Sequence, residues 1–325
     1  MALVKNIKET VTGLDIFNAI RNDGVSDEFR NRIPEGTLTN LKDVAAAMEQ
    51  YTPSYNEFME PLINRIGLII LNYRMWSNPL SQFKRKLEYG QTVQEIQTDL
   101  IKAVALKFKD ENNPFAKNIP DTKVVYHNVD KQNTYVATIN EDQVRTAFLS
   151  WDGIKSLTDS IITSLYTSYY WDDYLCCREI LVNACEKKKG FLVSCPYIGN
   201  KGADAAKEFI QAVKTYAGKL KFLSKSYNAS GIHTFTPPEN LVLFIDPEVN
   251  SNIDVNVLSA AFQLAYAKIG FTVIEVDELP YGVSGILCDA EFLRIYNYTE
   301  RMTSLFNPKD LSTNYFLNVR NVYSS

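Results

Sequence analysis

The longest helical pattern in the chain runs from residue 154 to residue 189 and contains neither glycine nor proline. Its apolar positions step by three or four, which places them on one face of a helix. They are Ile154, Leu157, Ile161, Leu165, Tyr169, Cys176, Ile180 and Ala184. Three lysines and then Gly190 follow, as is typical of a helix end. We predict one helix of about 54 Å, bent where Asp172 and Asp173 interrupt the stripe. A coiled coil is disfavoured, because the charged residues expected at the e and g positions of its heptads are missing.

The residues after this helix alternate between helical and strand-like patterns. Helices are predicted over 203–220 and 255–267, and strands over 241–245, 271–276 and 285–288. This order is typical of a compact α/β unit. The tail, 292–323, alternates like antiparallel strands separated by a turn at 307–310.

The first 140 residues have a sparser apolar pattern. Short helices are predicted over 15–21, 41–51 and 55–62, followed by an apolar strand over 66–73. Extended segments follow over 92–100, 123–127 and 134–139, and residues 126–135 resemble a hairpin around a polar turn. Because a two-stranded hairpin is marginally stable alone in water, we expect this region to lie on another surface.

Composition places the chain among ordinary globular proteins. It has 325 residues, 46% hydrophobic and 22% charged, and a net charge of −4. A general nucleic-acid binder would need a basic excess, so that class is excluded. The 19 tyrosines exceed the 17 phenylalanines, which fits extensive protein–protein contact.

Cysteine and histidine numbers narrow the chemistry and the compartment. Five cysteines, two of them adjacent, and two histidines argue against a disulfide framework and a multi-histidine metal centre. The N-terminus lacks the apolar region of a signal peptide, and no apolar run approaches the length of a membrane span. We expect the protein to be made and used in reducing cytoplasm, without a membrane.

Three predicted strands end in a carboxylate, at Asp246, Asp277 and Asp289. Carboxylates at the ends of α/β strands can hold magnesium, so a metal-dependent phosphohydrolase is one alternative. The simpler interpretation is that each aspartate accepts turn N–H groups.

Two further patterns are weaker candidates for chemistry. Gly199-Asn200-Lys201-Gly202 precedes a helix but lacks the spacing of a phosphate loop. Cys195 with His127 or His233 could form a nucleophile–base pair, although the spacing does not support it. We therefore predict no catalytic residue, no cofactor and no metal site.

Several segments, in order along nearly the whole chain, resemble the major capsid protein of small podophages of the phi29 type. They are Asn18–Asn22, Arg65–Leu68, Asn78–Leu80, Phe83-Lys84, Thr92–Ile96, Ala147–Trp151, Ser160–Ile162, Ile245-Asp246 and Ile253–Leu258. The resemblance implies an α+β, HK97-like capsid fold. It also implies a structural protein that self-assembles into pentamers and hexamers of a head filled with double-stranded DNA. Its implied partners are a scaffolding protein, a portal at one vertex and other copies of itself.

The resemblance also implies a domain organisation. Residues 1–75 would be an N-terminal arm with a first strand, and 76–140 an extended E-loop that lies on a neighbouring subunit. Residues 141–190 would be the peripheral domain with its spine helix, 191–290 the axial domain, and 291–325 the strands that return to the peripheral domain. Phi29 carries a further immunoglobulin-like domain for which this chain has no room, and a short C-terminal piece is expected to be missing.

The basic run Lys84-Arg85-Lys86 lies within the expected E-loop region. Such runs are usually solvated, but this region already requires a partner surface. We predict that the run contacts the spine helix of a neighbouring subunit, where Asp172, Asp173 and Glu179 are candidate acidic partners. A cellular nanocompartment shell of the same fold remains a second alternative.

Overall fold

The structure is a computed structural model that describes residues 12–23, 25–50, 57–58, 76–87, 92–101, 103, 117, 119–186, 202–228, 230–256, 272–280 and 282–324. Its helices are α1 (Gly13–Asp23), α2 (Asp27–Arg32), α3 (Leu41–Glu49), α5 (Glu141–Ala147), α6 (Trp151–Glu186), α7 (Gly202–Leu220) and α8 (Pro247–Asn256). Its strands are β1 (Lys84–Lys86), β2 (Thr92–Thr98), β3 (Thr122–Asn128), β4 (Lys131–Asn140), β5 (Leu241–Ile245), β6 (Thr272–Glu275), β7 (Gly285–Asp289), β8 (Arg294–Asn307) and β9 (Ser312–Ser324). Short 3-10 helices lie at Pro79–Phe83, Pro238–Asn240 and Ala290–Phe292.

The strands form three sheets. Four strands pair in the order β1-β8-β9-β4, three in the order β6-β5-β7, and β2 pairs with β3 alone. The chain divides into two compact units, one of residues 1–78, 132–173 and 299–320, and one of 79–131, 174–298 and 321–325. Helix α6 contributes residues to both units.

The core of the first unit joins the N-terminal helices to the start of α6. Side chains of α1, α2 and α3 pack with those of β4, α5, α6 and β9 in one buried cluster. Its largest members include Phe17, Phe29, Tyr169 and Tyr315. Helices α1 and α3, which were predicted from a sparse apolar pattern, therefore bury their apolar side chains against later segments of the chain.

The core of the second unit surrounds β5, all five residues of which are buried. Successive strand side chains point to opposite faces. Val242 and Phe244 pack with the end of α6, whereas Leu241, Leu243 and Ile245 pack in clusters with α7 and α8. A strand covered on both faces needs a continuous apolar run, which explains the sequence Leu-Val-Leu-Phe-Ile.

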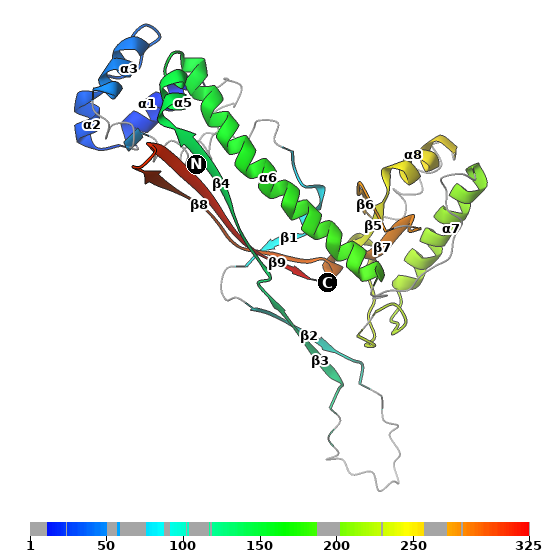
Figure 1. Ribbon diagram of the computed structural model, residues 1–325. Coiled ribbons are helices and arrows are strands. Elements are labelled where there is room, and N and C mark those ends of the chain that lie inside the picture. The colour runs from blue at the N-terminus through cyan, green and yellow to red at the C-terminus, as the bar shows by residue number, and fades with distance from the viewer. Residues whose placement is uncertain are drawn as a thin grey trace, which may run out of the picture. The chain divides into compact units, whose positions relative to one another are not determined.

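Helix α6 confirms the strongest sequence prediction and extends it. It starts three residues earlier than predicted, at Trp151, because Ser150 Oγ accepts the Gly153 N–H at 2.9 Å, an interaction typical of a helix cap. The helix continues through Asp172 and Asp173 to Glu186 (Figure 1). The Asp173 side chain is buried and accepts a hydrogen bond from the Asn78 amide at 2.8 Å, so a polar contact replaces the apolar one at that point of the stripe.

Most of the other predicted helices and strands agree with the structure, and one predicted hairpin does not. Strands β2 to β9 and helices α1, α3 and α7 lie where the sequence predicted them, within a few residues, while β1 and helices α2, α5 and α8 were not predicted. The predicted hairpin over 126–135 is wrong, because β3 pairs with β2 and β4 belongs to the four-stranded sheet. The strand predicted over 66–73, most of the helix over 55–62, Lys187–Gly190 and residues 257–267 lie outside the described residues. None of the described helices combines the length and apolar character that a membrane span requires.

Candidate inter-subunit surface

Strands β2 and β3 form a two-stranded antiparallel ribbon, which we call the β2–β3 hairpin (Figure 1). Ile96 is paired with Val124, and Tyr126 lies two residues further along β3, so the three side chains share one face of the ribbon. They are 59%, 42% and 61% exposed, respectively. Within the subunit, this face therefore leaves apolar area in water that a partner could cover.

The opposite face of the ribbon carries an ion pair. Arg294, the first residue of β8, donates from Nε and Nη2 to the two carboxylate oxygens of Glu95 at 2.8 and 2.7 Å. Hydrogen bonds from the Arg294 guanidinium are the largest cause that lowers the pKa of Glu95 to about 2. A bidentate pair of this kind fixes geometry as well as adding energy.

His127 joins this ion pair to the end of the chain. Its ring is buried, with Nε2 3.3 Å from Glu95 Oε2 and Nδ1 2.9 Å from Ser324 Oγ. Four residues from β2, β3, β8 and β9 are thereby linked through side chains. We call this set, Glu95, His127, Arg294 and Ser324, the hairpin anchor.

A second group of contacts holds the residues beyond the ribbon. Asp99 lies directly after β2 and accepts from Lys225 Nζ at 2.5 Å, and its other oxygen lies 2.6 Å from His233 Nδ1. These two side-chain hydrogen bonds are the main causes that lower the pKa of Asp99. Lys123 of β3 donates to the carbonyl of Ser230 in the same loop. Both histidines therefore lie beside carboxylates, His127 beside Glu95 and His233 beside Asp99.

The basic run lies elsewhere than predicted. Lys84–Lys86 form β1, which pairs in parallel with Ile295–Asn297 of β8 at the edge of the four-stranded sheet, and not on the unsupported hairpin. Arg85 Nη2 lies 3.3 Å from Glu291 Oε1, and these side chains are 51% and 57% exposed. The run thus presents its charge from an edge strand, a place where charged residues discourage unwanted strand pairing.

The three predicted acidic partners differ in availability. Asp173 is buried against Asn78, so its proposed contact with another subunit is unsupported by its position. Asp172 is half-buried and accepts from the Tyr135 hydroxyl at 2.9 Å. Glu179 is exposed on α6, and of the three it remains the candidate best placed for a partner.

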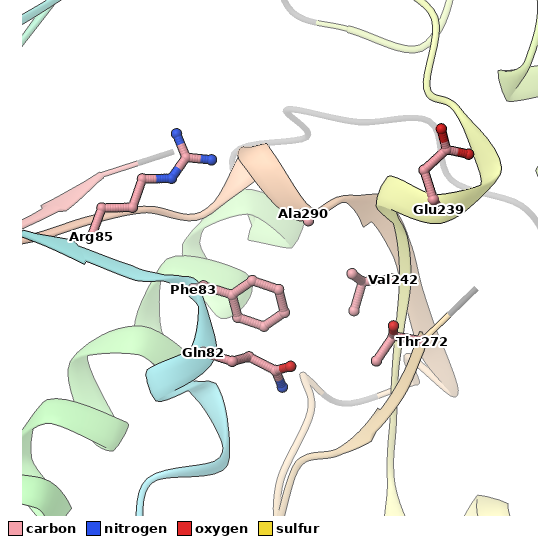
Figure 2. A pocket seen from close by; sticks show the side chains of 7 residues that line it. All are labelled: Gln82, Phe83, Arg85, Glu239, Val242, Thr272 and Ala290. Carbon is pink, nitrogen blue, oxygen red and sulfur yellow. The ribbon is translucent and has the colours of Figure 1, made fainter. Parts of the chain in front are cut away.

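A small cavity lies between the 3-10 helix before β1 and the β5–β6 pair. It measures about 260 Å³ and is lined by Gln82, Phe83, Arg85, Glu239, Val242, Thr272 and Ala290. The Phe83 ring points toward Val242, and Arg85 and Glu239 lie at its edges (Figure 2). Because small-molecule sites usually measure about 300–1,000 Å³, we assign it no cofactor.

The three strand-end carboxylates do not converge. Strand β7 runs antiparallel to β5, so Asp289 is paired with Leu241, whereas Asp246 follows the opposite end of β5. Asp246 and Asp289 accept the N–H groups of Glu248 and Glu291, each at 2.8 Å, as expected of turn acceptors.

Asp277 has a different role from the other two. It accepts hydrogen bonds from the Tyr174 hydroxyl and from Arg178 Nη1, the latter at 3.1 Å. Burial, followed by this hydrogen bond with Asp277, raises the pKa of Tyr174 to about 12. Among the residues with described positions, no three His, Cys, Asp or Glu side chains are grouped to hold a metal ion.

Two candidate motifs cannot be placed, since Cys195 and residues 199–201 lie outside the described residues. Conversely, no sequence pattern predicted a role for Glu95, Asp99 or Arg294. The only local signal was that Glu95 shares the less exposed side of β2 with Val93. Its partner Arg294 is 199 positions away, and no spacing rule connects them.

Comparisons with known proteins point to phage capsids. Residues 17–325 match the family described as Phi29-like phage major capsid protein. The chain is 31% identical to the major capsid protein of Bacillus phage B103, over 99% of this chain and 72% of that protein. It is 30% identical to the major capsid protein of Bacillus phage GA-1, over 99% of this chain and 70% of that protein.

Solved structures show the same fold at much lower identity. A chain of the capsid structure of Staphylococcus phage Andhra superposes with a TM-score of 0.59 at 10% identity, covering 77% of this chain and 82% of that one. A chain from the structure of the head fibre and inner core protein gp22 of bacteriophage P68 gives a TM-score of 0.57 at 12% identity, covering 78% and 83%.

Proposed function

The chain belongs to the Phi29-like phage major capsid protein family, and we propose that its β2–β3 hairpin joins each subunit to a neighbour in the shell. The protein is a structural major capsid protein of the phage head with an HK97-like fold, and its place is the virion capsid. Membership in this family implies that copies of the chain associate with one another into a shell. These findings favour neither the phosphohydrolase nor the cellular nanocompartment.

The observation that carries the proposed role of the hairpin is its asymmetry. One face is held to its own subunit by the hairpin anchor, while the other exposes Ile96, Val124 and Tyr126. Covering the apolar area that these side chains still expose stabilises an interface by about 25 cal/mol for each Å² buried. A fixed ribbon with one uncovered apolar face is suited to a contact that repeats between identical subunits.

The finer organisation of the shell is part of the same proposal. Subunits would assemble in the host cytoplasm as pentamers and hexamers around a scaffolding protein, with a portal at one vertex and double-stranded DNA bound without sequence specificity. Residues 76–140 would act as the E-loop, 1–75 as the arm, 141–190 with 291–325 as the peripheral domain, and 191–290 as the axial domain. A net charge of −4 suits a shell that holds DNA only weakly.

We propose that the protein has no enzymatic activity, and electron microscopy with an activity assay tests the whole assignment. Protein produced together with its scaffold is expected to form closed shells. The variant Asp246→Asn/Asp289→Asn should form them as efficiently, because asparagine oxygens can still accept the turn N–H groups. Neither protein should hydrolyse phosphate esters when divalent metal is added. Protein that stays unassembled at every concentration, or a metal-dependent phosphatase activity lost in the variant, would contradict the assignment.

The basic run Lys84–Lys86 is proposed to contact a neighbouring subunit, with Glu179 the most accessible acidic candidate. The variant Lys84→Glu/Arg85→Glu/Lys86→Glu is expected to lower shell yield, most strongly at low salt, while the unassembled subunit melts within a few degrees of the parent. Exposed ion pairs contribute only about 0–1 kcal/mol each, but the contact recurs at every subunit. Shell yield across a salt series, measured by sedimentation, is the readout.

The exchange variant Arg85→Glu/Glu291→Arg is the matched control, because it keeps an ion pair within the subunit and the net charge of the chain. If the triple variant assembled poorly only because it lost the Arg85–Glu291 ion pair within the subunit, the exchange variant would assemble as efficiently as the parent. Equal yields for the parent and the triple variant at every salt concentration would show that the run is only solvated surface.

A further inference from the structure

The loop between α7 and β5, residues 221–236, exposes three large apolar side chains. Phe222, Leu223 and Phe235 are 74%, 52% and 58% exposed, respectively. An antiparallel β-bridge between Ser224 and Thr234 brings the chain at Leu223 beside the chain at Phe235. Large apolar side chains that gather at one place on a surface mark an interaction site. We call residues 221–236 the α7–β5 loop.

Hydrogen bonds fix the conformation of the α7–β5 loop within its own subunit. The side-chain amide of Asn228 donates to the Ile232 carbonyl and to Thr234 Oγ1, each at 2.7 Å. Its oxygen accepts from the Gly231 N–H at 2.8 Å and from the Ser230 hydroxyl at 3.0 Å. Because the loop is already ordered in the free subunit, binding a partner does not carry the entropy cost of ordering it.

The charged side chains around this apolar surface are lysines. Residues 219–236 contain three lysines and no aspartate or glutamate, although the whole chain has a net charge of −4. Lys225 pairs with Asp99 of the segment after β2, whereas Lys219 and Lys221 are exposed. The exposed apolar side chains therefore have two cations beside them, and the surface favours a partner that offers both apolar and acidic groups.

The opposite end of the same three-stranded sheet has the complementary charge. The α7–β5 loop leads into the start of β5, and β6 runs parallel to β5, so the residues after both strands lie at the far end. Residues 246–256 and 272–280 contain no lysine or arginine. Half-buried Leu279 and Pro280 lie beside the carboxylates there. These carboxylates, which we call the acidic end, are Asp246, Glu248, Glu275, Asp277 and Glu278.

We propose that the α7–β5 loop of one subunit docks on the acidic end of the next copy of the chain. Two α7–β5 loops would repel each other through their lysines, so a contact of the loop with itself is disfavoured. A contact between two different surfaces of one chain repeats from copy to copy and closes into a ring. The proposal rests on association of the chain into a shell, and it names an interface separate from the β2–β3 hairpin.

DNA is the other polyanion that lysines could attract. Phosphate contacts would use Lys219 and Lys221 and leave Phe222 and its apolar neighbours in water. A protein partner covers the apolar side chains as well, and aromatic side chains are enriched in protein interfaces. The second copy is therefore the occupant that accounts for both features, and the contact should form in shells that hold no DNA.

Zero-length cross-linking of such shells tests the contact. A carbodiimide joins a lysine amine to a carboxylate that touches it, with loss of water. DNA-free shells produced together with scaffold should yield peptide pairs that link Lys219 or Lys221 to the acidic end. A denaturing gel should show a ladder of linked subunits that ends at the pentamer and the hexamer. The variant Lys219→Arg/Lys221→Arg is the matched control, because it keeps both charges without the amines; it should form shells and lose these pairs.

Charge exchange tests the same contact without a reagent. The variant Lys219→Glu/Lys221→Glu should lower shell yield about tenfold or more at low salt, while the unassembled subunit melts within a few degrees of the parent. Adding Glu248→Lys/Glu278→Lys to the same chain makes the two surfaces complementary again and restores the net charge, so most of the shells should return.

The outcomes separate this contact from the shell assignment. Parent shells without the expected peptide pairs, equal yields for the parent and Lys219→Glu/Lys221→Glu, or no recovery in the exchanged chain would overturn the contact and leave the shell assignment standing. Parent protein that forms no shells at any concentration would contradict both.

Discussion

Replacing Ile96 and Val124 together with aspartate is expected to abolish shell formation at concentrations where the parent assembles fully. The two residues are paired across β2 and β3 and lie on the exposed apolar face of the hairpin. Loss of about 3 kcal/mol at one contact corresponds to on the order of 100-fold in affinity, and the loss recurs at every subunit. Electron microscopy and sedimentation velocity measure the outcome. Because neither side chain belongs to a buried cluster, the unassembled subunit should keep its circular dichroism spectrum and its melting temperature within a few degrees.

The variant Thr98→Asp/Thr122→Asp provides a matched control for charge and strand propensity. Thr98 is paired with Thr122 at the next position on the same face, so this change adds the same two carboxylates without removing large apolar side chains. It should reduce assembly much less than the Ile96/Val124 change. Efficient assembly of Ile96→Asp/Val124→Asp, or equal defects in both variants, would mean that the apolar face is not the contact.

Arg294→Ala is expected to cause the largest loss of subunit stability among the substitutions considered. It removes both hydrogen bonds to Glu95 and leaves that carboxylate, mostly shielded from solvent, beside the buried ring of His127. Hydrogen bonds to charged groups contribute about 1.5–3 kcal/mol, so a decrease of this size in the free energy of unfolding is expected from urea titration. Arg85→Ala removes an arginine from an exposed pair and should cost no more than about 1 kcal/mol. If the two variants are equally stable, the hairpin anchor does not hold the hairpin.

The same ion pair gives a signature in the dependence of stability on pH. The pKa of Glu95 is lowered to about 2 in the folded protein, chiefly by hydrogen bonds from Arg294. The stabilisation is therefore fully present above the ordinary glutamate pKa of about 4.3, and it is lost as pH falls toward the folded value. The free energy of unfolding of the parent should decrease over this window, and that of Glu95→Gln should decrease less. Parallel curves for the two proteins would contradict the assignment.

Local sequence determined the elements whose burial pattern is regular. The stripe from Ile154 to Ala184 predicted α6, because apolar residues at steps of three or four lie on one face, and can be buried together, when the chain forms a helix. The apolar run Leu241–Ile245 predicted β5, because only a strand covered on both faces is apolar at every position. The ordered resemblance along the chain gave the family and the fold, and both are confirmed.

Tertiary structure alone decided which strands pair and which charges meet. Residues 126–135 have the local pattern of a hairpin, yet β3 pairs with β2 and β4 joins another sheet. Lys84–Lys86 pair with a strand about two hundred positions later, and Arg294 meets Glu95 across a similar separation. Asp173, polar in sequence, is buried because Asn78 supplies its hydrogen bond. Strand pairs and ion pairs of this kind are selected by the free energy of the whole packed subunit, and a local pattern holds no information about a partner that lies far away in the chain.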